Sequence, residues 1–231
     1  MKIKNILLLS AISLTAFSAQ SRLYVGAGAA YVNSMSIIKL TAREAALSGT
    51  VTMDDNSKKI APRFFAGYEK DNNNCYWGLE AFGSFSDLHG QNGRDFVAVR
   101  NGANYQAVLT NPGIKYSRSY LLGARAKFGG YITDNLSVFG AFGVIGSEFK
   151  ISYTDADRTA PANFKKTVLG IEPGVGISYR INSKWRTGLE YFYQQYSTFS
   201  KTYTDTVNGY SATTKSKFRF STFMASVSYV F

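Results

Sequence analysis

Charged side chains recur within stretches that are otherwise apolar, aromatic or rich in glycine. Both signs are present, so these groups could neutralise one another if the fold brought them together away from water. Such a cluster either fills a closed interior with ion pairs or lines a path along which ions move. The residues concerned are Arg63, Glu80, Arg125, Glu172, Arg186 and Glu190.

Nucleophilic catalysis is a second chemistry that the residue types allow. His89, which precedes Gly90, has Ser84 and Ser86 nearby, and a histidine can act as the base for a serine nucleophile. The flanking residues match no enzyme motif, and a single histidine beside glycine is more typical of a solvated turn. With one histidine and one cysteine, Cys75, the chain has no metal-ligand spacing. We therefore expect no enzyme activity, no metal and no cofactor.

Alternation of apolar with small or polar residues predicts the elements that position these charges. At the end of the chain, Phe223, Val227 and Phe231 share one face of a strand, while Thr222 and Ser226 share the other. The same period of two predicts eight strands, at about residues 22–33, 60–70, 75–85, 118–130, 136–153, 166–180, 184–196 and 221–231. The phase of 136–153 stays open because both of its faces are apolar.

The charges fall on the face of each strand that lies opposite the apolar one. Arg63 and Glu69 alternate with Phe64 and Tyr68, for example. A charge on a lipid-facing surface near the bilayer midplane costs about 2 to 4 kcal/mol, so we expect these charges to face inward. Eight strands enclose little more than side chains, which favours a structural plug over a gated ion path. We expect Arg125 to pair with at least one of Glu80, Glu172 and Glu190.

The amino-terminal segment has the features of a secretory signal peptide, residues 1–21. Lys2 and Lys4 precede an apolar run over residues 6–14, and small residues allow cleavage after Ser18 or Ser21. That run is shorter than the roughly 20 residues of a membrane-spanning helix. We expect the mature chain, residues 22–231, to contain no membrane helix and to form one barrel domain.

Short and long connections alternate between the predicted strands. The short ones lie near Asn73, Thr133 and Asn182, and the long ones at about residues 34–59, 86–117, 152–165 and 198–216. Outer-membrane barrels have short periplasmic turns and long outer loops, so we expect periplasmic termini and extracellular long loops. Aromatic residues near the short-turn ends predict an interfacial girdle of Tyr68, Trp77, Phe128, Tyr179, Trp185 and Tyr229.

Two internal stretches and the carboxyl terminus carry a resemblance to a known group. Residues 122–136 and 174–191, with the terminal Phe231 two residues after Tyr229, are similar to small eight-stranded outer-membrane barrels: the OmpA transmembrane domain, OmpX and the opacity-type surface proteins. The resemblance covers residues 22–231. It implies an all-β, closed eight-stranded antiparallel up-and-down transmembrane β-barrel in a bacterial outer membrane, with Tyr229 and Phe231 as a signal for the barrel assembly machinery.

Positive charge is concentrated in the long connections. The formal charge is +11, and removal of Lys2 and Lys4 leaves +9, of which the long connections and the residues at their edges hold +7. The surface residues concerned are Lys58, Lys59, Arg94, Arg100, Lys165, Lys166, Lys215 and Lys217. We expect acidic partners, namely lipopolysaccharide and outer-membrane lipid and, beyond them, acidic glycans or receptors on a host. The location argues against nucleic acid, and we expect a monomer.

The favoured function is that of an integral outer-membrane protein displaying long basic surface loops for adhesion, host interaction or envelope integrity. The alternatives are a small pore or hydrophobic-solute conduit and, with less support, a lipid-modifying barrel enzyme. A soluble barrel around an apolar ligand fits poorly, because the inward faces carry charge and glycine.

Overall fold

The computed structural model describes residues 21–44, 47–55, 57–72, 74–85, 88–92, 96–100, 103–109, 113–154, 163–205 and 210–231. Every regular element in these ranges is a β-strand. None of the described residues forms a helix that is long and apolar enough to cross a membrane. The predicted signal peptide lies outside the described residues except for Ser21.

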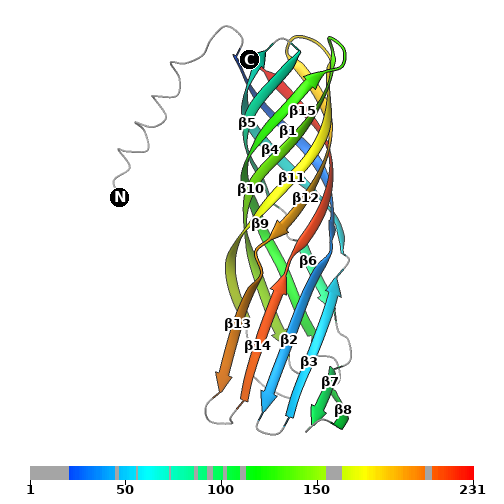
Figure 1. The fold of residues 1–231 in the computed structure, drawn as a ribbon, viewed down its shortest axis with the longest axis vertical. Coiled ribbons are helices and arrows are strands. Elements are labelled where there is room, and N and C mark those ends of the chain that lie inside the picture. Colours follow the sequence, from blue (N-terminus) through cyan, green and yellow to red (C-terminus); the bar gives the residue numbers. More distant parts are fainter. Residues whose placement is uncertain are drawn as a thin grey trace, which may run out of the picture.

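Eight long antiparallel strands close into a barrel, as the sequence predicted (Figure 1). They are β1 (Ser21–Ser34), β4 (Lys58–Asn72), β5 (Cys75–Ser84), β9 (Gly113–Tyr131), β10 (Leu136–Thr154), β11 (Asn163–Arg180), β12 (Trp185–Tyr196) and β15 (Arg219–Val230). The order β10-β11-β12-β15-β1-β4-β5-β9 returns to β10, because β9 also pairs with β10. Strands that are neighbours in the barrel are thus neighbours in sequence, apart from the closing pair β15 and β1.

Tight turns join strands at one end of the barrel. The Asn182 Oδ1 atom accepts hydrogen bonds from the backbone N–H groups of Lys184 at 2.9 Å and Trp185 at 2.8 Å, which fixes the β11–β12 turn. The Phe231 N–H group donates to the Leu23 carbonyl oxygen at 2.9 Å. The two ends of the barrel segment therefore lie together, at the end that we call the short-turn end. Asn73, in the predicted first turn, lies outside the described residues.

The outer face of the barrel is apolar. Along β11, outward side chains run from Tyr179 to Leu169, and Leu169 is 69% exposed. The ten residue-to-residue steps between them, at about 3.3 Å each on a strand tilted by about 40°, span roughly 25 Å, the height of the apolar band of a transmembrane barrel. Cys75 is exposed.

Strand β10, whose phase the sequence left open, turns its odd-numbered residues inward. Phe139, Ile145 and Phe149 are buried, whereas Phe142 and Val144 are exposed. Both sets are apolar because one faces the barrel interior and the other faces outward.

Inside the barrel, each of six aromatic side chains lies opposite a glycine on the neighbouring strand. Because glycine has no Cβ, the ring can lie across the backbone of that strand and fill the interior. The pairs are Tyr24 and Gly67, Phe65 and Gly26, Tyr76 and Gly129, Phe82 and Gly123, Phe139 and Gly176, and Phe192 and Gly174.

The described parts of the long connections are mostly β-strands, which corrects the expectation of long loops. Six of them form a second sheet in the order β13-β14-β2-β3-β7-β8, and β6 (Leu88–Asn92) pairs with the outer part of β9. The members of the second sheet are β2 (Ser36–Glu44), β3 (Leu47–Asp55), β7 (Phe96–Arg100), β8 (Ala103–Leu109), β13 (Phe199–Asp205) and β14 (Tyr210–Lys217). The physical reason is that threonine, although polar, suits a pleated strand. Thr202 and Thr213, for example, hydrogen-bond across β13 and β14 through their hydroxyl oxygens at 3.0 Å.

The second sheet prolongs the barrel at the end opposite the short turns (Figure 1). Strand β2 follows β1 after Met35 alone, and β14 continues into β15 after Phe218. The pairing of β11 with β12 ends at Gly170 and Tyr196. Beyond that point, among the described strands, β11 pairs only with β10 and β13 only with β14, so the prolongation does not close.

We predict that Gly123→Ala destabilises the barrel by about 1 to 3 kcal/mol. A Cβ atom at this position would lie 2.5 Å from Phe82 Cζ and 2.7 Å from the Val144 carbonyl oxygen. The free energy of unfolding in urea, followed by tryptophan fluorescence in neutral micelles, measures the effect. Gly140→Ala is the matched control, because nothing lies within 4 Å of its added Cβ. Equal stability of the two variants would contradict the glycine and aromatic packing.

Candidate functional site

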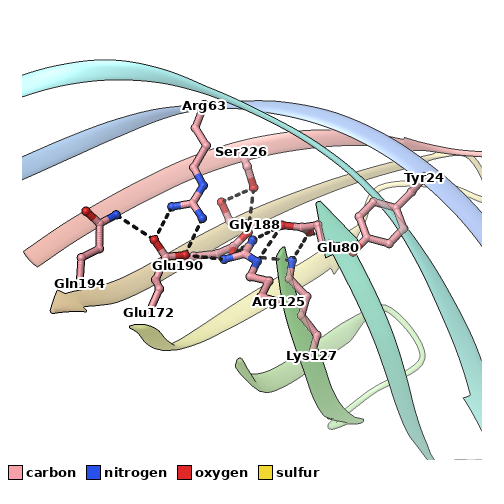
Figure 2. Close-up of polar contacts among 10 residues, drawn as sticks. All are labelled: Tyr24, Arg63, Glu80, Arg125, Lys127, Glu172, Gly188, Glu190, Gln194 and Ser226. Carbon is pink, nitrogen blue, oxygen red and sulfur yellow. Dashed lines mark hydrogen bonds and ion pairs between the residues drawn. The ribbon is translucent and has the colours of Figure 1, made fainter. Parts of the chain in front are cut away.

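Arg125, on β9, lies at the centre of a cluster of buried charges in the barrel interior (Figure 2). Its Nε atom donates to Glu80 Oε1 at 2.7 Å, and its Nη2 atom lies 2.5 Å from that oxygen and 2.8 Å from Glu190 Oε2. Its Nη1 atom lies 4.0 Å from Glu172 Oε1. Strands β5, β11 and β12 thus bring three carboxylates to one guanidinium group.

Glu172 links this centre to a second branch of the cluster. Arg63, on β4, forms a two-point ion pair with it, from Nη1 to Oε2 at 3.1 Å and from Nη2 to Oε1 at 2.5 Å. The amide nitrogen of Gln194 donates to Glu172 Oε2 at 2.8 Å, and its amide oxygen accepts from Arg118 Nη1 at 2.9 Å. Arg118 therefore reaches the carboxylate through Gln194. Within the described residues it has no direct carboxylate partner.

Glu80 is held by donors from three other positions in the barrel wall. Besides Arg125, the Lys127 Nζ atom lies 2.7 Å from Glu80 Oε2, and the Tyr24 hydroxyl donates to the same oxygen at 2.9 Å (Figure 2). Lys127 also lies 3.7 Å from Glu190 Oε2. A buried carboxylate is stable only when its oxygens are paired in this way.

A separate ion pair lies nearer the short-turn end. The two terminal nitrogens of Arg186 donate to the two carboxylate oxygens of Glu69, each at 2.6 Å. Between this pair and the residues Lys127 and Glu190 lies a cavity of about 30 Å³. That volume holds about one water molecule.

Aromatic rings fill the space around and beyond the charges. The Arg63 guanidinium carbon lies 3.8 Å from the centre of the Phe82 ring, and that of Arg125 lies 4.4 Å from the centre of the Phe192 ring. Toward the second sheet, Phe149 stacks on Phe218 with ring centres 4.0 Å apart. Charge pairs and rings together occupy much of the described part of the interior.

The arrangement can therefore stabilise a closed barrel. Its described charges are the cations Arg63, Arg118, Arg125, Lys127 and Arg186 and the carboxylates Glu69, Glu80, Glu172 and Glu190. Nearly equal numbers of the two signs, each within bonding distance of another polar group, favour a plug. No group of three or more His, Cys, Asp and Glu side chains that could hold a metal occurs in the described ranges.

The structure places all six charges that the sequence selected inside the barrel, but it does not join them into one set. Arg63, Glu80, Arg125, Glu172 and Glu190 lie together, whereas Arg186 pairs with Glu69 across the small cavity.

Four other members of the site were not among the residues that the sequence selected for the cluster. Alternation had already placed Glu69 and Lys127 on the inward faces that carry Arg63 and Arg125, but it did not show that they pair with the selected charges. Gln194 and Tyr24 have the same inward phase but carry no charge. Arg118, at the edge of the predicted connection 86–117, was one of the residues whose positive charge the sequence assigned to the long connections, and the structure corrects this. It is 1% exposed, because a register shift in the β9–β10 pairing, where Ser147 lies opposite Leu121 but Phe149 lies opposite Arg118, reverses the alternation of β9 and turns Arg118 inward.

The predicted basic surface residues that the structure describes lie toward the end of the barrel opposite the short turns. Lys58, Lys59, Lys165, Lys166 and Lys215 are exposed and Lys217 is partly exposed. Arg94 lies outside the described residues. Arg100 and His89 lie in β7 and β6, where only the backbone is described.

The residues assigned to the assembly signal lie at the short-turn end. The Tyr229 ring centre is 5.2 Å from that of Trp185 and 5.1 Å from that of Phe231. Phe231 is exposed on the outer face of the barrel.

Comparison with known proteins agrees with this geometry. A family model described as outer membrane protein beta-barrel domain matches residues 6–231. No curated protein sequence matches the chain.

Solved structures with a similar fold include OprG from Pseudomonas aeruginosa, at 10% identity and a TM-score of 0.57, covering 91% of this chain and 96% of OprG. The outer membrane protease OmpT from Escherichia coli is also similar, at 10% identity and a TM-score of 0.53, covering 94% of this chain and 99% of OmpT. Ail, the attachment invasion locus protein of Yersinia pestis, matches at 15% identity and a TM-score of 0.41, covering 92% of this chain and 99% of Ail. At these identities the likeness shows the fold alone.

We predict that Arg125→Ala lowers the free energy of unfolding by about 3 to 5 kcal/mol, because it leaves buried carboxylates without their counter-charge. Urea unfolding in neutral micelles measures the loss. Arg125→Lys, which keeps the charge but contacts fewer oxygens, should fall between the wild type and Arg125→Ala.

The matched control for this prediction is Arg22→Ala. Arg22 pairs with Asp71 at 3.0 Å, but its side chain is 35% exposed, so its loss should cost about 1 kcal/mol or less. If Arg125→Ala unfolds at the same urea concentration as Arg22→Ala, the interior charges do not stabilise the barrel.

Proposed function

Because the chain belongs to the outer-membrane β-barrel domain family, we propose that it is a non-conducting surface protein whose second sheet binds an acidic partner outside the cell. One observation carries this proposal. At the height of the apolar band the interior is filled by ion pairs and rings, while the strands continue beyond the band to build a further sheet. Rigid barrels that present extended outer segments are suited to recognition.

The proposal requires the short-turn end to face the periplasm and the second sheet to lie outside. Alternation of short and long connections supports this orientation, since barrels of this kind have their short turns on the periplasmic side. Aromatic pairs at the short-turn end, such as Tyr68 with Trp77 at 5.8 Å between ring centres, fit an interfacial girdle there. In this orientation, Tyr229 and Phe231 are presented to the barrel assembly machinery at the periplasmic side.

A basic stripe on the outward face of β2 and β14 is the proposed contact surface. Lys39 lies directly opposite Lys215, and Lys217 lies opposite Ile37. Lys39 and Lys215 are exposed. Sulfated or sialylated host glycans have the complementary charge, and attraction of this kind increases the rate of encounter. The proposed role is binding by a monomer, without catalysis or nucleic acid.

The small-pore alternative has less support, because an eight-stranded barrel filled with side chains has no aqueous lumen. We predict no sustained conductance when the refolded wild-type protein is inserted in a planar bilayer. Insertion is checked by the change of gel mobility on boiling. If inserted protein gives stable single-channel conductance steps, the protein is a pore and the binding proposal is wrong.

We predict that a variant with Lys39, Lys215 and Lys217 all replaced by Gln binds immobilised heparin several-fold more weakly than the wild type. The wild-type interaction should also weaken steeply between low and physiological salt, where charges are screened beyond about 8 Å. Lys70→Gln with Lys184→Gln is the control, because these lysines lie at the short-turn end. Salt-insensitive binding, or an equal loss in the control, would contradict the basic stripe as the contact surface.

A further inference from the structure

Three lysines on adjacent strands converge on the outward face, at a different place from the basic stripe. Lys150 on β10 lies directly opposite Lys165 on β11. On the other side of β10, Lys115 on β9 lies opposite Ser152, two residues along from Lys150. Lys115 and Lys165 are exposed and Lys150 is partly exposed. We call these residues the lysine triad.

The triad lacks a compensating carboxylate among the described residues. Directly opposite residues have Cβ atoms about 4.5 to 5.5 Å apart, and like charges at that position destabilise the strand pair. The nearest described acidic residue on this face is Glu148, two residues before Lys150 and opposite Thr167. It forms no ion pair with a lysine of the triad in the described part of the chain. An anion between the lysines would relieve their repulsion.

The position of the triad relative to the apolar band indicates where that anion comes from. Val144 and Leu169, which are 61% and 69% exposed, are the last large apolar side chains of β10 and β11 before the triad. Lys165 lies four residues beyond Leu169, or about 10 Å along the barrel axis for a tilted strand. The headgroup layer of a bilayer begins at this height, and flexible lysine side chains reach back toward it.

We propose that the lysine triad binds the phosphate groups of an anionic membrane lipid, whose acyl chains lie against Val144 and Leu169. Lys150 and Lys165 would hold one phosphate between two ammonium groups, each of which has three N–H donors. Lys115 lies within reach of a second phosphate on the same headgroup. The inference is independent of the proposed recognition by β2 and β14, because it uses other strands and a ligand within the bilayer.

Glu148 provides a separate test, since it lies on the membrane side of the triad. Its carboxylate opposes the approach of a phosphate from the lipid. Glu148→Gln should therefore strengthen lipid binding by a few-fold, whereas a surface lysine cluster without a lipid ligand would give no such gain.

Native mass spectrometry of the refolded protein in neutral detergent tests the proposal, with diphosphoryl lipid A as the probe and phosphatidylcholine as the neutral comparison. We expect wild-type protein to retain lipid A and not phosphatidylcholine. The variant with Lys115, Lys150 and Lys165 all replaced by Gln should bind lipid A at least tenfold more weakly. The control variant has Lys58, Lys70 and Lys184 replaced by Gln. It loses the same amount of positive charge as the triad variant, but from separate sites. Equal weakening in both variants would overturn the site.

Two further measurements separate the lipid from other anions and from effects on folding. The triad should prefer lipid A to anions that carry no acyl chains. If inorganic phosphate or heparin displaces lipid A at equal concentration, the bound phosphate does not have to come from a lipid, and the proposal is overturned. Lys165→Gln should raise the unfolding midpoint in lipid-free neutral micelles, where only repulsion is lost, and lower it in micelles containing lipid A. A shift of the same sign in both micelles would also overturn the proposal. None of these results depends on whether heparin binds Lys39, Lys215 and Lys217.

Discussion

This barrel depends on one constraint: its interior has almost no room for water, so the carboxylates inside it must be neutralised by other side chains. Glu80, Glu172 and Glu190 come from three strands, and Arg125 reaches all three from a fourth. Since side chains alternate along a strand, a slip of one residue would turn Arg125 toward lipid and leave the carboxylates unpaired. The ion pairs therefore fix the register of the strands around the barrel, even where their net contribution to stability is small.

The same constraint accounts for the glycines and aromatic rings. Room for Arg63 and Arg125 between Phe82 and Phe192 exists because those rings lie across Gly123 and Gly174 on the neighbouring strands. Rings over guanidinium groups replace part of the hydration that burial removes. The proposed role therefore uses the outer surfaces of the barrel, rather than its interior, for interaction with other molecules.

Much of this structure could be predicted from alternation alone, because a barrel wall with lipid on one side enforces a strict period of two. That rule located the eight barrel strands and the inward phase of Arg125 and Glu190. It failed for β10, where Phe149 is apolar because it packs in the interior and Phe142 is apolar because it faces outward. It also failed for the long connections, where threonines such as Thr202 and Thr213 pair in strands instead of forming loops. It also could not show that Arg118 points inward, since the register shift that reverses the alternation of β9 depends on its pairing with β10. Which inward charges pair depends on strand stagger, which alternation does not specify, so the separation of Arg186 from Arg125 could not be predicted from the sequence.

The open outer sheet has a consequence for how this chain can change over generations. A closed ring ties strand number, tilt and stagger together, so an insertion in one barrel strand disturbs all of its neighbours. The sheet that begins at β13 and ends at β8 carries no such closure condition. The hairpins β2–β3 and β13–β14 can therefore gain or lose residue pairs at their tips while the ion pairs below keep their geometry. Sequence drift should concentrate in these hairpins, giving the protein a surface that can diversify on a scaffold that cannot.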